Sequence, residues 1–76
     1  MPKTPLRKAR EVSRLTQDEV AARARIDQSH YARIELGRWG CSAEVAAKLA
    51  RIFRRRGLNE MHVLFPRRYR SFQPEA

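Results

Sequence analysis

Three polar side chains near the middle of the chain are of types that can read the edges of base pairs in DNA. Gln28, Ser29 and Arg33 fall within the stretch QSHYARIELGR at residues 28–38. An amide can bond adenine at N6 and N7, a guanidinium can bond guanine at O6 and N7, and a hydroxyl can bond several bases. At about 100° per residue the three share one side of a helix. The pattern predicts a base-reading face, although a merely solvated helix face has a similar composition.

The residue types of the chain give little support for catalysis or metal binding. The chain has one cysteine, Cys41, and two histidines, His30 and His62, without the spacing of zinc ligands. No carboxylate or nucleophile is spaced to work with His30. We therefore expect no enzyme activity, no metal and no cofactor. Cys41 is expected to be reduced and partly buried, and His62 to be an ordinary surface residue.

Composition places the chain among small, basic, folded proteins. It has 76 residues, of which 42% are hydrophobic, and a formal net charge of +9 that is mostly due to arginine. Arginine favours planar partners such as phosphate and guanine, so nucleic acid is the expected class of partner and an anionic membrane surface the competing one. No segment reaches the ~20 apolar residues of a membrane span, and the start lacks the apolar middle of a signal peptide. We expect a cytoplasmic protein with no membrane contact.

The elements that must position these side chains begin with two short helices. Thr4 before Pro5 predicts a helix from Pro5 to about Arg14. Thr16 and Glu19 form a capping box, which predicts a second helix of about two turns. The residues expected to face the core from these helices are Leu6, Ala9, then Ser13 or Leu15, and Val20, Ala21 and Ala24.

A third helix carries the polar residues described first. Asp27 can cap it, it extends from Gln28 to Leu36, and Gly37 ends it as glycines after helices do. Its inward residues at helical spacing are Tyr31, Ile34 and Glu35.

Two more helices are expected in the second half of the chain. Ser42 caps one from residue 43 to about residue 55, with an apolar stripe at three- and four-residue steps. Asn59 caps a short one at residues 60–65. No run alternates as a strand would, so the expected fold class is all-α, with five helices in a compact domain of residues 1–66.

The second and third helices, joined by a three- or four-residue corner, have the arrangement that places a helix in the major groove of DNA. Here the sequence resembles the lambda-like phage repressors and Cro proteins, also called Xre-type helix-turn-helix regulators. The resemblance covers about residues 6–65. It is carried by LRKAR at 6–10, LTQDEVAARA at 15–24, QSHYARIELGR at 28–38 and EVAAKLARIF at 44–53. It implies a lambda-repressor-like five-helix fold that binds double-stranded DNA.

The resemblance also implies roles for single residues. In the family the start of the second helix holds the DNA backbone, and the outer face of the third reads bases. It implies base reading for Gln28, Ser29 and Arg33, backbone contact for Gln17, His30 and Arg38, and a structural pair of Arg10 with Glu35.

The chain departs from the family pattern on both sides of the third helix. Relatives often have glycine at the corner where Arg25 stands, and a left-handed backbone at another residue costs about 1–2 kcal/mol. The sequence leaves two alternatives: the corner keeps the left-handed geometry at that cost, or it has a different shape. After Arg38 the chain continues with WGCS instead of a basic or proline-rich loop. Trp39 is expected to pack over the core and not to stack on DNA.

The end of the chain has two interpretations. Residues 67–76 are expected to form a loosely ordered basic tail, and the FPRRYRSF stretch alternates aromatics with arginines as both nucleic-acid-binding segments and protein interfaces do. The last predicted helix is too apolar for full exposure, and in repressors of this type the last helix often meets its twofold mate. We expect a homodimer with an interface of Met61, Leu64, Phe65, Tyr69 and Phe72.

Three functions follow from these observations. The first is a phage or prophage repressor or Cro-like regulator that binds a near-palindromic operator. The second is an antitoxin, with a small toxin as protein partner, or a restriction-modification controller. The third is a protein-interaction module or anti-repressor that has lost DNA binding.

Overall fold

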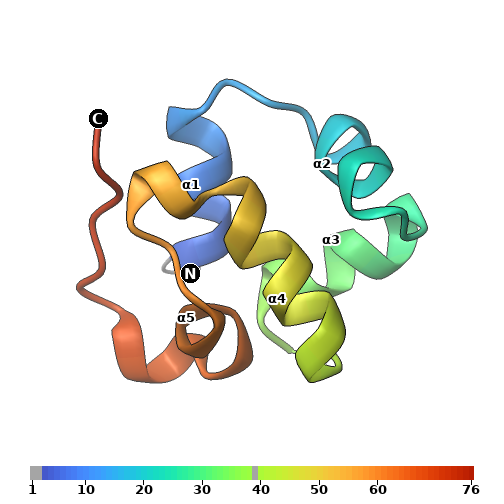
Figure 1. Cartoon of the computed structure of the whole chain (residues 1–76). Coiled ribbons are helices and arrows are strands. Elements are labelled where there is room, and N and C mark those ends of the chain that lie inside the picture. The colour runs from blue at the N-terminus through green and yellow to red at the C-terminus, as the bar shows by residue number, and fades with distance from the viewer. Residues whose placement is uncertain (1–2, 39) are drawn as a thin grey trace.

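The computed structural model describes residues 3–38 and 40–76, which form helices joined by short turns (Figure 1). The α-helices are α1 (Pro5–Val12), α2 (Gln17–Ala24), α3 (Gln28–Leu36), α4 (Ala43–Ile52) and α5 (Glu60–Leu64), and two 3-10 helices are η1 (Arg54–Arg56) and η2 (Pro66–Tyr69). These described residues contain no strand, so the predicted all-α, five-helix class is confirmed. None of their helices is long and apolar enough to cross a membrane. Trp39, expected to pack over the core, lies outside the described residues.

Side chains cap the starts of most helices. The hydroxyls of Thr4, Thr16 and Ser42 each accept a hydrogen bond from the backbone N–H three residues further on. Glu19 returns the contact to the backbone N–H of Thr16, which completes the predicted capping box. Asp27 stands at the cap position of α3 but makes no side-chain capping bond.

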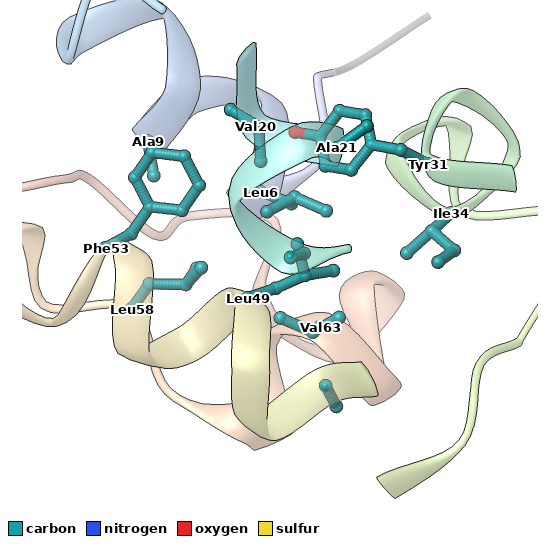
Figure 2. Packing of buried hydrophobic residues seen from close by; sticks show 12 residues of the cluster. Leu6, Ala9, Val20, Ala21, Tyr31, Ile34, Leu49, Phe53, Leu58 and Val63 are labelled. Carbon is teal, nitrogen blue, oxygen red and sulfur yellow. The ribbon is translucent and has the colours of Figure 1, made fainter. Parts of the chain in front are cut away.

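The core fills the space between the helices (Figure 2). Its largest fully buried side chains include Leu6, Val20, Tyr31, Leu49 and Phe53. The first four come from α1, α2, α3 and α4, and Phe53 directly follows α4. Cutting such a side chain to alanine typically costs 2–5 kcal/mol, so these contacts dominate stability. The inward residues predicted for α1, α2 and α3 are buried, except that Ser13 and Leu15, the alternatives predicted at the end of the first helix, are both half-buried.

Two helices end earlier than predicted. α1 stops at Val12 and not near Arg14, because Arg14 adopts a left-handed backbone with φ 58°. The N–H groups of Arg14 and Leu15 then bond the carbonyls of the last turn, and Leu15 packs against the core. α4 stops at Ile52 and not near residue 55, because the chain tightens into η1 there.

The corner between α2 and α3 keeps the left-handed geometry although it lacks glycine. Arg25 has φ 57° and ψ 46°, so of the two shapes that the sequence left open the corner adopts the left-handed one. The N–H of Arg25 donates to Ala22 O at 3.2 Å and that of Ile26 to Ala21 O at 3.0 Å, the two bonds of a Schellman motif. Ile26 also packs against the core. These contacts outweigh the cost of the left-handed backbone.

Arg25→Gly is therefore expected to stabilise the fold by about 0.5–1 kcal/mol, because glycine adopts this backbone without a Cβ clash. Thermal unfolding followed by circular dichroism should show a melting temperature a few degrees higher. Arg23→Gly is the matched control: it removes the same charge two residues earlier, inside α2, where glycine costs about 1 kcal/mol. Shifts of the same sign in both variants would contradict this account of the corner.

The tail is packed against the helices, in contrast to the loose order expected for it. Lys8 Nζ donates to the carbonyls of Arg70 and Phe72, each at 2.9 Å. Further along, the N–H of Glu75 donates to Arg56 O at 2.9 Å, and the Arg56 guanidinium donates back to Glu75 O at 3.2 Å. The last helix, α5, ends one residue earlier than predicted. The chain then passes through η2 into the tail, which packs against the helices.

His62 is half-buried, so the prediction of an ordinary surface residue is wrong. Its Nδ1 accepts a hydrogen bond from the N–H of Asn59 at 3.0 Å, and Asn59 Oδ1 accepts one from the N–H of His62 at 3.1 Å. Its ring contacts Tyr69 and Phe72, with centroids 4.7 and 4.4 Å away. His62 thus caps α5 and anchors the tail, and burial lowers its pKa.

Acid is expected to weaken the fold through His62. Its pKa in the folded chain lies below the usual 6.5, so its contribution is complete above about pH 6.5 and is lost as the pH falls through that lower value. The melting temperature should drop between about pH 7.5 and about pH 5. His62→Gln keeps a capping-box side chain that does not titrate, so its drop should be smaller. Parallel profiles for the two proteins would exclude His62 as the cause.

Candidate nucleic-acid interface

The outer face of α3 carries the three residues predicted to read bases. Gln28, Ser29 and Arg33 are all exposed, and Leu36 on the same face is 57% exposed. The opposite face of α3 is buried against the other helices. An α-helix with its side chains is about 10–12 Å across and the major groove is ~12 Å wide, so α3 and its outer side chains can enter it.

A buried ion pair fixes α3 to α1. Arg10 Nε donates to Glu35 Oε2 at 2.8 Å and Arg10 Nη2 to Glu35 Oε1 at 2.9 Å, a bidentate contact. The side chains are only 15% and 4% exposed, respectively. Arg10 Nη1 also donates to Leu15 O at 2.9 Å. The hydrogen bonds to Glu35 raise the pKa of Arg10, so its charge is permanent.

Tyr31 is a buried residue that interacts electrostatically with both members of this pair. Its ring is fully buried, and its hydroxyl oxygen has no hydrogen-bond partner among the described residues. Burial raises the pKa of Tyr31 far above its usual value, and the negative charge of Glu35 raises it further. Tyr31 therefore stays neutral and acts as a core residue.

A chain of hydrogen bonds leads from the ion pair to the outer face. Gln17 Nε2 donates to Glu35 Oε1 at 3.3 Å, and Gln28 Nε2 donates to Gln17 Oε1 at 3.0 Å. An amide has two N–H donors and one oxygen, so Gln28 keeps a donor and an acceptor for the edge of a base. The contact between Gln17 and Gln28 was not predicted. No spacing rule signals it, because the two residues lie on different helices.

The residues assigned to the backbone lie around this face. Gln17, half-buried, is the first residue of α2, and His30 is exposed in the first turn of α3. Arg38 is exposed just after Gly37, whose φ of 77° ends α3. Gln17 and Arg38 thus lie at opposite ends of the outer face of α3.

The residues predicted to form a dimer interface are only partly available. Met61 and Phe65 are 41% and 42% exposed. Leu64 and Phe72 are half-buried and pack against the core of their own chain, and Tyr69 is half-buried against His62. Exposed apolar surface in this region is therefore centred on Met61 and Phe65.

Cys41 is the free thiol among the described residues, half-buried against the core, and burial raises its pKa. The described residues contain no group of three or more histidine, cysteine, aspartate or glutamate side chains that could hold a metal ion.

One comparison with known proteins finds a match. A family model described as a helix-turn-helix domain matches residues 5–62, which is more than half of the chain and extends from the start of α1 into α5. No curated protein and no solved structure matches the chain.

Proposed function

The chain belongs to the helix-turn-helix domain family, and from that premise we propose that it is a sequence-specific transcriptional regulator that binds double-stranded DNA. Helix-turn-helix proteins place their second motif helix in the major groove. The observation that carries the proposal is the outer face of α3, whose exposed polar residues are linked through Gln17 to the buried pair of Arg10 and Glu35.

Each side chain has a role that its chemistry permits. Gln28 would bond adenine through its amide, and Arg33 would bond guanine through its guanidinium. Gln17 would hold a phosphate at the start of α2, where free backbone N–H groups add donors. Arg38 and His30 would contact phosphates on the flanks of the groove. The net charge of +9 would draw the chain toward DNA and make affinity fall with salt.

A homodimer would give the protein its full site. Two α3 helices would enter successive major grooves about 34 Å apart, on a near-palindromic operator, and binding would exclude or recruit polymerase. The exposed side chains of Met61 and Phe65 support an interface at α5. This is the mode of a phage or prophage repressor or a Cro-like protein.

Selection of binding sites from random duplex DNA, followed by sequencing, tests the proposal directly. We expect an enriched motif with two related half-sites about one helical turn apart. Absence of any enriched motif would contradict sequence-specific binding and favour a protein-interaction module. A small toxin that co-purifies with the chain would instead indicate an antitoxin.

Sedimentation equilibrium tests the dimer. We expect Met61→Ser with Phe65→Ser to weaken self-association, because serine removes the exposed apolar surface. Val12→Ser is the control, since Val12 is equally exposed, at 41%, but lies on α1. A wild-type chain that stays monomeric at all concentrations would exclude the proposed interface.

A further inference from the structure

A basic hollow lies where the tail meets the start of α1 and the end of α3. Its volume is about 230 Å³, and four of its lining residues are the cations Lys3, Arg38, Arg67 and Arg70. No acidic residue lines it. Lys3 is paired with Glu11 at 2.7 Å, so the arginines supply the positive charge of the hollow. Converging guanidinium groups favour an anion and suit phosphate oxygens in particular.

A second hollow continues the first along the proposed DNA-binding surface. The two share Lys3, Thr4 and Leu36 in their linings, so they adjoin. The second extends to Arg7 and Gln17, the latter at the position assigned to a backbone phosphate, and its lining also includes Glu35, which is paired with Arg10. Together the hollows form a continuous groove from the start of α2, past the start of α1, to the tail.

The charged side chains of Arg67 and Arg70 remain available to a ligand, whereas the backbone carbonyl of Arg70 accepts a hydrogen bond from Lys8. Both are exposed, and no other described residue forms a salt bridge or hydrogen bond with either guanidinium. They lie three residues apart in and after η2, and a 3-10 helix has 3.0 residues per turn, so they share one side of it. Arg68 points elsewhere and stacks over the ring of Phe65 at 4.7 Å.

The tail is held in position by contacts that leave these two arginines at the hollow. Lys8 bonds the carbonyls of Arg70 and Phe72, and Phe72 packs against the core. A segment that is already ordered loses little conformational entropy when it binds, so its charges contribute more to affinity.

We propose that Arg67 and Arg70 bind phosphates of the DNA backbone beside the major groove into which α3 would fit. This inference rests on the proposed function. It extends the DNA-binding surface beyond residues 5–62, the part of the chain that matches the helix-turn-helix family, and makes the tail part of the DNA interface. Phosphate contacts carry no sequence information, so the tail adds affinity and salt dependence to any duplex.

The test compares two double variants. One carries Arg67→Ala and Arg70→Ala, and the control carries Arg54→Ala and Arg55→Ala. Both remove two exposed arginines, but Arg54 and Arg55 line neither hollow. Binding to a fluorescent random-sequence duplex of about two helical turns is followed by anisotropy from about 50 to about 200 mM salt. Thermal unfolding of each variant confirms that it remains folded.

Loss of two phosphate contacts should make the slope of log K against log salt shallower by about 1.8 and weaken binding roughly tenfold or more at 0.1 M salt. The Arg54 and Arg55 variant should keep a slope close to that of the wild type. Equal slopes in the two variants would overturn the inference while the proposed function stands, because the wild type would still bind. A wild type that binds no duplex at any salt would overturn both. If the Arg67 and Arg70 double variant lost self-association but kept the wild-type salt slope of DNA binding, the inference would be wrong and the tail would belong to an interface between two copies of the chain.

Discussion

Glu35→Ala is expected to destabilise the fold by about 3–5 kcal/mol, because it leaves the buried guanidinium of Arg10 without its partner. Glu35 is 4% exposed and accepts two hydrogen bonds from Arg10 and a third from Gln17. Small domains have total stabilities of about 5–15 kcal/mol, so much of the stability of this chain would be lost. Urea unfolding followed by circular dichroism measures the change.

Glu11→Ala is the matched control for this prediction. Glu11 also pairs with two cations, Lys3 at 2.7 Å and Arg7 at 3.3 Å, but its side chain is 35% exposed. Exposed pairs contribute roughly 0.2–1 kcal/mol, because water and salt screen them. Similar losses for Glu11→Ala and Glu35→Ala would show that burial does not set the energy of the pair.

Replacing both members of the buried pair separates its structural role from its role at the site. Arg10→Met with Glu35→Leu removes both charges and keeps apolar volume, so stability should return to near the wild-type value. Gln17 would lose its acceptor on Glu35, so DNA binding should remain weaker than in the wild type. A double variant that binds DNA as tightly as the wild type would exclude the pair as a support of Gln17.

Arg33→Ala is expected to cost about 1–3 kcal/mol of binding free energy at one base pair and to relax the sequence preference there. The reason is the proposed bidentate contact with guanine from the exposed face of α3. Affinities for the selected motif and for its single-base variants provide the measurement. The wild type should discriminate at that position and Arg33→Ala should not.

Arg38→Ala provides the contrast, because a backbone contact cannot distinguish bases. It should weaken binding to all sequences by a similar factor and make the salt slope shallower by about 0.9. If Arg33→Ala and Arg38→Ala changed specificity and salt dependence in the same way, the division between reading and positioning residues would be wrong.

Local signals made much of the fold predictable. A helix start depends on a capping side chain that bonds the backbone N–H three residues further on. Thr4, Thr16 and Ser42 therefore identified three helix starts correctly. Inward residues follow from helical periodicity, which is why the buried faces of α2 and α3 were predicted. Helix ends were less predictable. The ends at Arg14 and Arg25 depend on whether the next apolar residue reaches the core, and the sequence does not contain that information.

The residue types of the candidate site were predictable for the same reason, since the polar face of α3 lies within one periodic segment. The hydrogen bond between Gln17 and Gln28 was not predictable, because it depends on how α2 and α3 pack. His62 was misjudged because its partners Tyr69 and Phe72 belong to a tail without helical periodicity.

The sequence by itself determined an all-α chain, its helix starts, its basic charge and the polar face of α3, because these depend on neighbours within a few positions. Only the tertiary structure decided the left-handed corner at Arg25, the hydrogen bonds that link Glu35 through Gln17 to Gln28, and the course of the tail. Lys8 and Arg70, for example, are 62 positions apart, and folding alone brings them into contact. Such contacts depend on the packing of whole helices, and no local pattern encodes them.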